Sequence, residues 1–228
     1  MITVHHLETS RSQRVLWLLE ELGLPYEILR YRRNPKTMLA PPELKAVHPL
    51  GKSPVITDGE LTLAESGAIL EYLIETYGPS GDADGPVAQP RPGSDEQRQC
   101  RFWMHYAEGS LMNWLLMKLV FTTIPKQPMP FFVRPIARQL CGQALAKLVD
   151  PNLATALPFI DAHLAQNPWF AGERLTIADF QMSFPVAAAL ARVENAGSYP
   201  ALVAYKEKME ARPAYQRALE KGGPVVMG

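Results

Sequence analysis

The sequence predicts an α+β protein in which a small mixed sheet with helices precedes an all-helical domain. Strand and helix patterns alternate over residues 2–77. A segment rich in Gly, Pro and Asp follows at 79–93, and no strand pattern reappears after it. We therefore expect a sheet domain at 1–78, a linker at 79–93 and a helical domain at 94–228.

The first domain begins with a strand, a helix and a second strand. Residues 2–5 and 26–31 are the strand candidates. Between them, apolar side chains recur at helical spacing through 10–22, and Gly23 follows in the usual place for the end of a helix. The two strands of such a unit run parallel and are joined by a right-handed crossover.

An antiparallel hairpin and a further helix complete the sheet domain. Asp58-Gly59 has the composition of a tight two-residue turn, which joins strands at 55–57 and 61–64. The helix at 65–77 starts where the last strand ends. The expected sheet therefore has four strands of mixed direction.

The start of the 65–77 helix is a candidate anion site. Its first N–H groups have no partner inside the helix, and the helix dipole favours negative charge there. Ser66 adds a hydroxyl donor, and Glu65 suits an ammonium group beside the anion. A ligand that carries an α-amino and an α-carboxylate group fits best. The alternative is that Ser66 only caps the helix and Glu65 only stabilises its first turn.

A second candidate site lies at the turn before the 10–22 helix. Ser10 and Ser12 place hydroxyl groups at the positive end of that helix. A dipole and a donated hydrogen bond both favour the charged form of a thiol, so such a turn stabilises a thiolate. The alternative, that either serine is only an N-cap, fits the sequence equally well.

The second domain is expected to be entirely helical. Ser94 caps a helix to about residue 119, prolines indicate a loop at 122–130, and helices cover 131–149 and 153–166.

A capping box is predicted at 176–179, with Asp179 in place of the usual glutamate. Leu175 and Phe180 stand at the positions of a hydrophobic staple, so a buried helix is expected from the box to Leu190. Helical segments at 199–212 and to residue 219 end the domain.

Composition excludes several classes of function. The 228 residues carry a formal net charge of zero, so no basic surface for nucleic acid or an anionic membrane is expected. No apolar run is long enough to span a bilayer, and Cys100 and Cys141 are too few for a disulfide framework. We expect a soluble cytoplasmic protein with packed thiols and no metal site.

Three motifs at characteristic spacing carry a resemblance to a known family. They are Ser53-Pro54, Glu65-Ser66-Gly67-Ala68-Ile69 and the capping box at 176–179. From residue 2 to about 219 the chain resembles the glutathione transferases, which have a thioredoxin-like N-terminal domain and an all-α C-terminal domain. Segments 48–54, 106–111 and 129–131 look most like the serine-type branch that includes membrane-associated fungal and bacterial transferases.

The resemblance implies a glutathione site. Pro54 would be a cis-proline that turns the Ser53 backbone outward to pair with the cysteine of glutathione. Glu65 and Ser66 would hold the γ-glutamyl amino and carboxylate groups, and Lys52 would approach the glycine carboxylate.

Ser10 occupies the position of the hydroxyl that donates to the glutathione sulfur in serine-type members, so it is the predicted catalytic residue. Thr9, Arg11 and Ser12 could each reach the sulfur instead. The turn contains no cysteine, so a mixed disulfide with glutathione is not expected.

The resemblance also implies a homodimer that joins the glutathione thiolate to small electrophiles in detoxification. The electrophile pocket is expected near His6, Tyr106, Ser110 and Trp114, although aromatic side chains at helical spacing are more often core. The alternatives are a glutathione-dependent peroxidase or thiol reductase, or a non-catalytic regulatory protein with the same fold.

Overall fold

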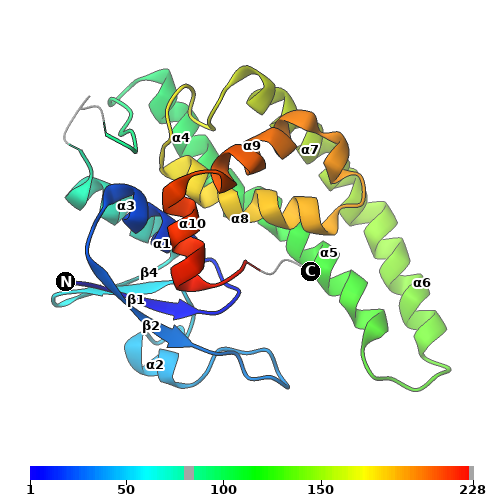
Figure 1. Cartoon of the computed structure of the whole chain (residues 1–228). Helices are drawn as coiled ribbons and strands as arrows, with labels where there is room; N and C mark the ends of the chain where they lie inside the picture. The colour runs from blue at the N-terminus through cyan, green and yellow to red at the C-terminus, as the bar shows by residue number, and fades with distance from the viewer. Residues whose placement is uncertain (80–84, 226–228) are drawn as a thin grey trace.

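The computed structural model describes residues 1–79 and 85–225, and its first part is a four-stranded sheet (Figure 1). The strand order is β2-β1-β3-β4. β1 pairs in parallel with β2, whereas β3 is antiparallel to both β1 and β4, so the mixed sheet is confirmed. Residues 80–84 of the expected linker lie outside the described residues. The strands are β1 (Ile2–Leu7), β2 (Tyr26–Tyr31), β3 (Val55–Asp58) and β4 (Leu61–Ala64).

Helices cover both faces of the sheet. α1 (Gln13–Leu22) and α3 (Ser66–Tyr77) pack on the face toward the helical domain, and the short α2 (Glu43–Val47) lies on the other face (Figure 1). α1 ends at Gly23, whose φ of 63° lies in the left-handed region that glycine adopts without strain. Since α1 is packed between the sheet, α8 and α10, nearly all of its residues are buried.

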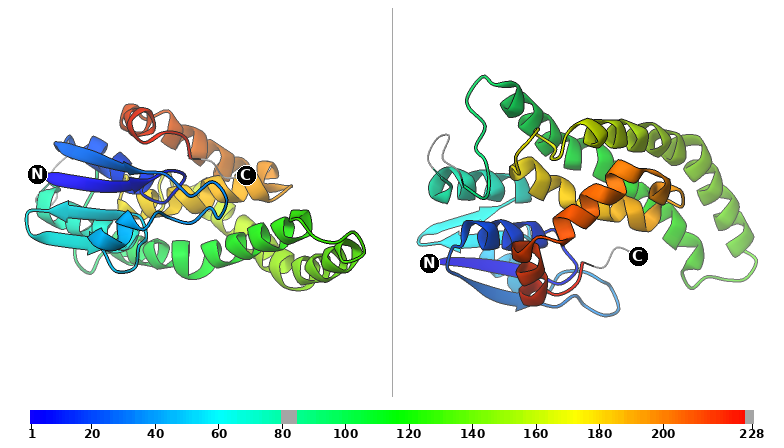
Figure 2. Two further views of the ribbon diagram at one scale, coloured as in Figure 1. Left: turned by 90° about the horizontal axis from the view of Figure 1, so that it is seen from below. Right: turned by 45° about the horizontal axis from the view of Figure 1, so that its top comes forward.

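The helical domain is built around α8, which contacts helices of both domains. α5 and α6 extend away from the sheet as an arm (Figure 2). The helices are α4 (Asp95–Tyr106), α5 (Met112–Thr123), α6 (Arg134–Ala144), α7 (Asp150–Gln166), α8 (Ile177–Arg192), α9 (Pro200–Glu210) and α10 (Pro213–Gly222).

Two π-helical turns change the expected helix boundaries. The predicted helix at 94–119 is interrupted by the turn Ala107–Leu111 and then continues to Thr123, so the predicted loop at 122–130 begins later. The second turn, Leu145–Val149, joins α6 directly to α7. Pro151, the second residue of α7, follows this π turn directly, and the helix continues through it.

The predicted capping box is present at the start of α8. The backbone N–H of Thr176 donates to Oδ2 of Asp179 at 2.8 Å, and the N–H of Asp179 donates to the carbonyl of Thr176 at 3.0 Å. Leu175 and Phe180, the two members of the predicted staple, are both buried.

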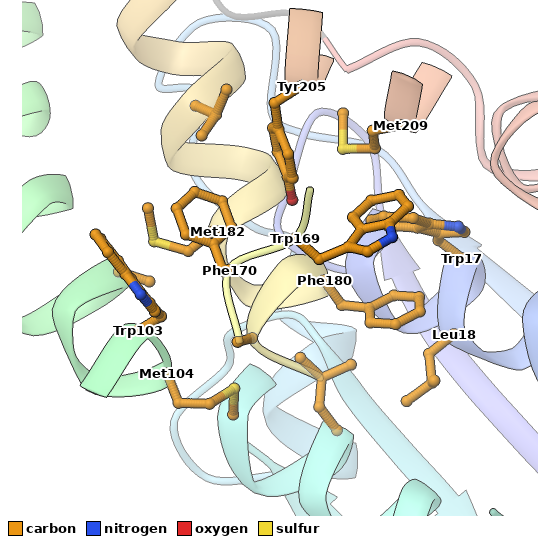
Figure 3. Packing of buried hydrophobic residues seen from close by; sticks show 14 of the residues in the cluster. Trp17, Leu18, Trp103, Met104, Trp169, Phe170, Phe180, Met182, Tyr205 and Met209 are labelled. Atoms are coloured by element: carbon orange, nitrogen blue, oxygen red, sulfur yellow. The ribbon is translucent and has the colours of Figure 1, made fainter. Parts of the chain in front are cut away.

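Aromatic side chains join the two domains into one core. Phe180 of α8 packs against Trp17 of α1 with 4.2 Å between ring centroids, and Tyr215 of α10 meets Trp17 edge-on at 5.2 Å. Figure 3 shows Phe180 beside Trp17, with Phe170 and Tyr205 around the start of α8. The domains therefore share an apolar interface rather than being connected only by the linker.

Charged pairs fix α10 to α1. The Glu20 carboxylate accepts hydrogen bonds from Arg217 Nε at 2.7 Å, from Lys221 Nζ at 2.5 Å and from the Tyr26 hydroxyl at 2.6 Å. Burial raises the pKa of Glu20, but these bonds outweigh burial and the pKa is lowered from its ordinary value of 4.5.

We expect Glu20→Gln to lower the free energy of unfolding at neutral pH by about 1 to 2 kcal/mol, because the cations it pairs with are half exposed and partly screened. Since the folded pKa is depressed, this stabilisation is present above about pH 5 and is lost as the pH falls through the folded pKa. Urea unfolding at several pH values tests this: the variant should lose less stability on acidification than the wild type. Glu220→Gln, an exposed change on the partner helix α10, is the control of equal charge.

Candidate active site

A cleft of about 620 Å³ lies between the sheet domain and the helical domain. Its walls come from the turn before α1, the loop before β3, the start of α3, α4 with its π turn, and α8. The lining residues are Arg11, Leu50, Lys52, Ser53, Pro54, Ala64, Glu65, Ser66, Gly67, Ala68, Glu71, Met104, His105, Glu108, Gly109 and Gln181. The cleft thus brings together all five residues predicted to bind glutathione.

The loop before β3 is held against β1 by a side chain. Ser53 Oγ donates to the carbonyl of His5 at 2.9 Å and accepts the N–H of Leu7 at 3.2 Å. The Ser53–Pro54 peptide is cis, as predicted. Lys52 is exposed on the rim of the cleft. With its side chain tied to β1, Ser53 lines the cleft at a fixed position.

The start of α3 has the geometry of an anion site. The first helical hydrogen bond runs from Ile69 N–H to the carbonyl of Glu65 at 2.9 Å, so the N–H groups of Ser66, Gly67 and Ala68 precede it. All three residues line the cleft. Glu65 has a φ of 73°, which costs a non-glycine residue of order 1 kcal/mol and is typical of functional sites. Its exposed side chain lines the same cleft as these N–H groups.

The Ser66 hydroxyl connects the domains. It accepts a hydrogen bond from Arg14 Nη1 at 3.0 Å and donates to Gln181 Oε1 of α8 at 3.2 Å. Because its single proton is used by Gln181, the anion site in this structure depends on the N–H groups at the start of α3.

A carboxylate between two guanidinium groups forms the opposite wall. Glu108 Oε1 accepts from Arg11 Nε at 2.8 Å and from Arg14 Nη1 at 2.7 Å. Burial lowers the pKa of Arg14 to about 10, so Arg14 remains protonated near neutral pH. Burial raises the pKa of Glu108, but the two arginines outweigh it and the pKa is lowered. The cluster therefore carries a net positive charge.

The Ser10 hydroxyl belongs to a buried chain of hydrogen bonds. Ser10 Oγ lies 2.7 Å from Ser12 Oγ, which lies 2.8 Å from His6 Nδ1, and His6 Nε2 lies 2.8 Å from the carbonyl of Gly222. A carbonyl can only accept, so Nε2 carries the proton. Burial lowers the pKa of His6, so the ring is neutral near pH 7 and Nδ1 accepts.

The donor directions in the rest of the chain follow from this tautomer. Ser12 donates to Nδ1 of His6, and its oxygen therefore accepts the proton of Ser10. Ser10 Oγ accepts the N–H of Ser12 at 3.3 Å. Ser10 is buried and is not among the residues that line the cleft, so its catalytic role stays a prediction.

Comparison with known proteins identifies the family. Residues 10–76 match the glutathione S-transferase N-terminal domain model, and residues 113–213 match the C-terminal domain model. Glutathione S-transferase 3 of Schizosaccharomyces pombe is 39% identical over 222 residues, which is 97% of this chain and 88% of that protein. The chain belongs to the glutathione S-transferase family.

Further relatives agree with this membership. Glutathione S-transferase 1 of Saccharomyces cerevisiae is 31% identical over 97% of this chain and 95% of its own. The crystal structure of a glutathione S-transferase from Actinobacillus pleuropneumoniae superposes with a TM-score of 0.74 at 34% identity, covering 100% of this chain and 95% of that one. The thioredoxin-like and all-α domains expected from the sequence are those of this glutathione S-transferase fold.

The residues predicted for the electrophile pocket are not brought to the cleft. His6 lines a separate cavity of about 260 Å³, with Thr9 and Gly222 among its other lining residues. Tyr106 stacks on Phe102 with 5.5 Å between centroids. Ser110 and Trp114 follow Tyr106 at helical spacing on the same side, and neither lines the cleft.

The cleft uses the other side of the same helical stretch. Its lining residues there are Met104, His105, Glu108 and Gly109, and Gln181 adds a contact from α8. The sequence contained one signal for this side: Gly109 interrupts a helical pattern, which often has a packing or functional reason. A Cβ at Gly109 would meet nothing within 4 Å, so this glycine faces open space.

Neither cysteine is placed for nucleophilic chemistry. Cys100 and Cys141 are buried and unpaired, as expected, and burial raises the pKa of Cys100 to about 11. Over residues 1–79 and 85–225, no group of three or more His, Cys, Asp or Glu side chains could hold a metal ion. The same residues include no helix that is long and apolar enough to cross a membrane.

Proposed function

We propose that this protein conjugates the thiolate of glutathione to small electrophiles, as a detoxifying glutathione transferase. The observation that carries the proposal is one cleft that joins Ser53 before the cis-proline to Glu65 and Ser66 at the start of α3. These groups suit the cysteine and γ-glutamyl parts of one peptide.

The binding mode follows from the chemistry of each wall. The Ser53 backbone pairs with the cysteine of glutathione as a short added strand. The N–H groups at the start of α3 hold the α-carboxylate, and Glu65 holds the ammonium group beside it. Lys52 on the rim reaches the glycine carboxylate. The electrophile occupies the side of the cleft formed by α4 and its π turn, where Gly109 leaves space.

The reaction is attack of the bound thiolate on an electrophilic carbon, with either departure of a leaving group or addition to a double bond. The positively charged cluster of Arg11, Arg14 and Glu108 and a helix N-terminus both favour the thiolate over the thiol. Lowering the thiol pKa by about two units near pH 7 raises the thiolate fraction up to roughly a hundredfold, partly offset by weaker nucleophilicity.

We also propose that the protein is a cytoplasmic homodimer. Two buried, unpaired cysteines suit a reducing compartment. Apolar side chains exposed on α4 and α5, among them Phe102, Leu116 and Val120, suit contact with a second copy. Sedimentation analysis of the purified protein measures the oligomeric state.

Glutathione titration by calorimetry, followed by assays with chlorodinitrobenzene and with cumene hydroperoxide, tests the proposed function. We expect binding and conjugation of the aryl chloride. Turnover of the hydroperoxide alone would favour the peroxidase alternative, and binding without turnover would favour a regulatory protein. An absence of glutathione binding would contradict the site itself.

A further inference from the structure

The sequence offers four residues of the β1–α1 turn, 9–12, as possible contacts of the glutathione sulfur. Only one of these four lines the cleft. Thr9 lines the separate cavity beside His6 and accepts a hydrogen bond from Arg33 Nε at 3.3 Å. Ser10 and Ser12 are buried in the chain that ends at the Gly222 carbonyl. Arg11 remains, and it lies in the cleft together with Ser53 and Glu65.

The hydroxyl chain leaves Ser10 without a proton for a ligand. Ser10 has one O–H, and the tautomer of His6 directs that proton to Ser12. A donation from Ser10 to a sulfur would take this proton away from Ser12 and break the buried bond between the two hydroxyls. This series of hydrogen bonds instead holds in place the turn that carries Arg11.

Arg11 is oriented to use its outer nitrogens in the cleft. Its Nε is bound to Glu108 at 2.8 Å, and its guanidinium carbon lies 5.3 Å from the centroid of the Phe184 ring. Within the part of the chain that the structure describes, Nε is the only Arg11 nitrogen with a hydrogen-bond partner. The side chain is 37% exposed, so both Nη groups remain available as donors.

The charges around Arg11 favour an anion beside it. Arg14, one turn further along α1, shares Glu108 with Arg11, so two cations face one carboxylate. Glu65 and Lys52 lie in the same cleft and are assigned to the opposite ends of glutathione. A thiolate next to Arg11 would balance the excess positive charge.

We propose that the Arg11 guanidinium, rather than the Ser10 hydroxyl, contacts the sulfur of bound glutathione and stabilises it as the thiolate. This inference rests on the proposed function. Ser10 and Ser12 are then positioning residues for the turn. The proton of the thiol leaves to solvent, since arginine stays protonated and cannot accept it.

The test compares Arg11→Met, Arg11→Lys and Ser10→Ala in the full-length protein, with Arg138→Met on the exposed side of α6 as a charge-matched control. Calorimetry gives the affinity for glutathione, and the ultraviolet absorbance of the thiolate gives the pKa of the bound thiol at saturation. We expect Arg11→Met to raise that pKa by about one unit or more, and each unit lowers the thiolate fraction at neutral pH by up to about tenfold. Arg11→Lys should raise it less, because the charge remains, and Arg138→Met should leave it unchanged.

Two outcomes would overturn the inference and leave the proposed function standing. One is a thiol pKa in Arg11→Met equal to that of the wild type while glutathione still binds. The other is a larger rise in Ser10→Ala than in Arg11→Met, which would return the sulfur contact to the hydroxyl. Failure of the wild-type protein to bind glutathione is a different result, and it would remove the proposed function itself.

Discussion

Replacing Asp179 by alanine is expected to lower the free energy of unfolding by about 3 to 5 kcal/mol, since it removes the acceptor of several buried donors and leaves a cavity. The carboxylate accepts the N–H of Phe170 at 2.9 Å and the N–H of Thr176 at 2.8 Å. The hydroxyls of Thr176 and Tyr205 also donate to it, at 3.3 Å and 3.4 Å.

These bonds hold three segments at one point. The segment before α8 contributes Phe170 and Thr176, α8 contributes Asp179 itself, and α9 contributes Tyr205. Phe170 and Tyr205 pack edge to face with 4.9 Å between ring centroids, and both rings are labelled in Figure 3. Without the carboxylate, two backbone N–H groups stay buried without an acceptor, and this is the main cost.

Equilibrium urea unfolding of the variant measures this loss. Asp95→Ala is the control, because Asp95 also lies in the first turn of a helix but its side chain is 87% exposed. The control should change stability by less than about 1 kcal/mol. Equal losses in the two variants would mean that the buried bonds at Asp179 add nothing beyond a surface charge.

Glu65→Gln is expected to weaken glutathione binding by about tenfold to a hundredfold, the value of one hydrogen bond between charged groups. The change keeps the shape of the side chain and removes the negative charge that faces the ligand's ammonium group. The side chain is exposed, so stability should be preserved.

Calorimetry on Glu65→Gln and on Glu60→Gln separates the loss of a contact with the ligand from the effect of a changed net charge. Glu60 is exposed in the β3–β4 turn and is absent from the cleft lining, so its variant changes net charge equally without touching the site. An affinity in Glu65→Gln equal to that of the control would show that Glu65 does not contact the ligand.

The sheet domain could be predicted closely because its signals are local. Gly23 ends α1 as expected, and the hairpin is present one residue later than predicted, because Asp58 pairs with Leu61 and Gly59-Glu60 makes the turn. In the helical domain the π turn Leu145–Val149 carries helix across the predicted break between residues 149 and 153, and the π turn Ala107–Leu111 lies inside what was predicted as one regular helix. A π turn changes the register by one residue without a distinctive composition, so periodicity alone does not reveal it.

In the candidate site, too, the features encoded by neighbouring residues could be predicted, and the contacts between distant residues could not. Lys52 to Pro54 and Glu65 to Ser66 are neighbours in sequence, and the structure brings them together as predicted. The Ser66 bonds to Arg14 and Gln181 span 52 and 115 residues, and no local pattern encodes such a contact. The choice between the Tyr106 and the Glu108 side of the helix depends on which side faces the sheet domain, and packing of the two domains decides it.

The position of α10 has a consequence for the order in which the protein can mature. The last helix lies on the first one through Glu20, and the Gly222 carbonyl holds His6 in the first strand. During synthesis the sheet and α1 are made long before residues 217–222, so the turn that carries Arg11 lacks these contacts until α10 has left the ribosome. The sheet domain therefore gains these supporting contacts only after α10 has been made, although its own residues are made much earlier.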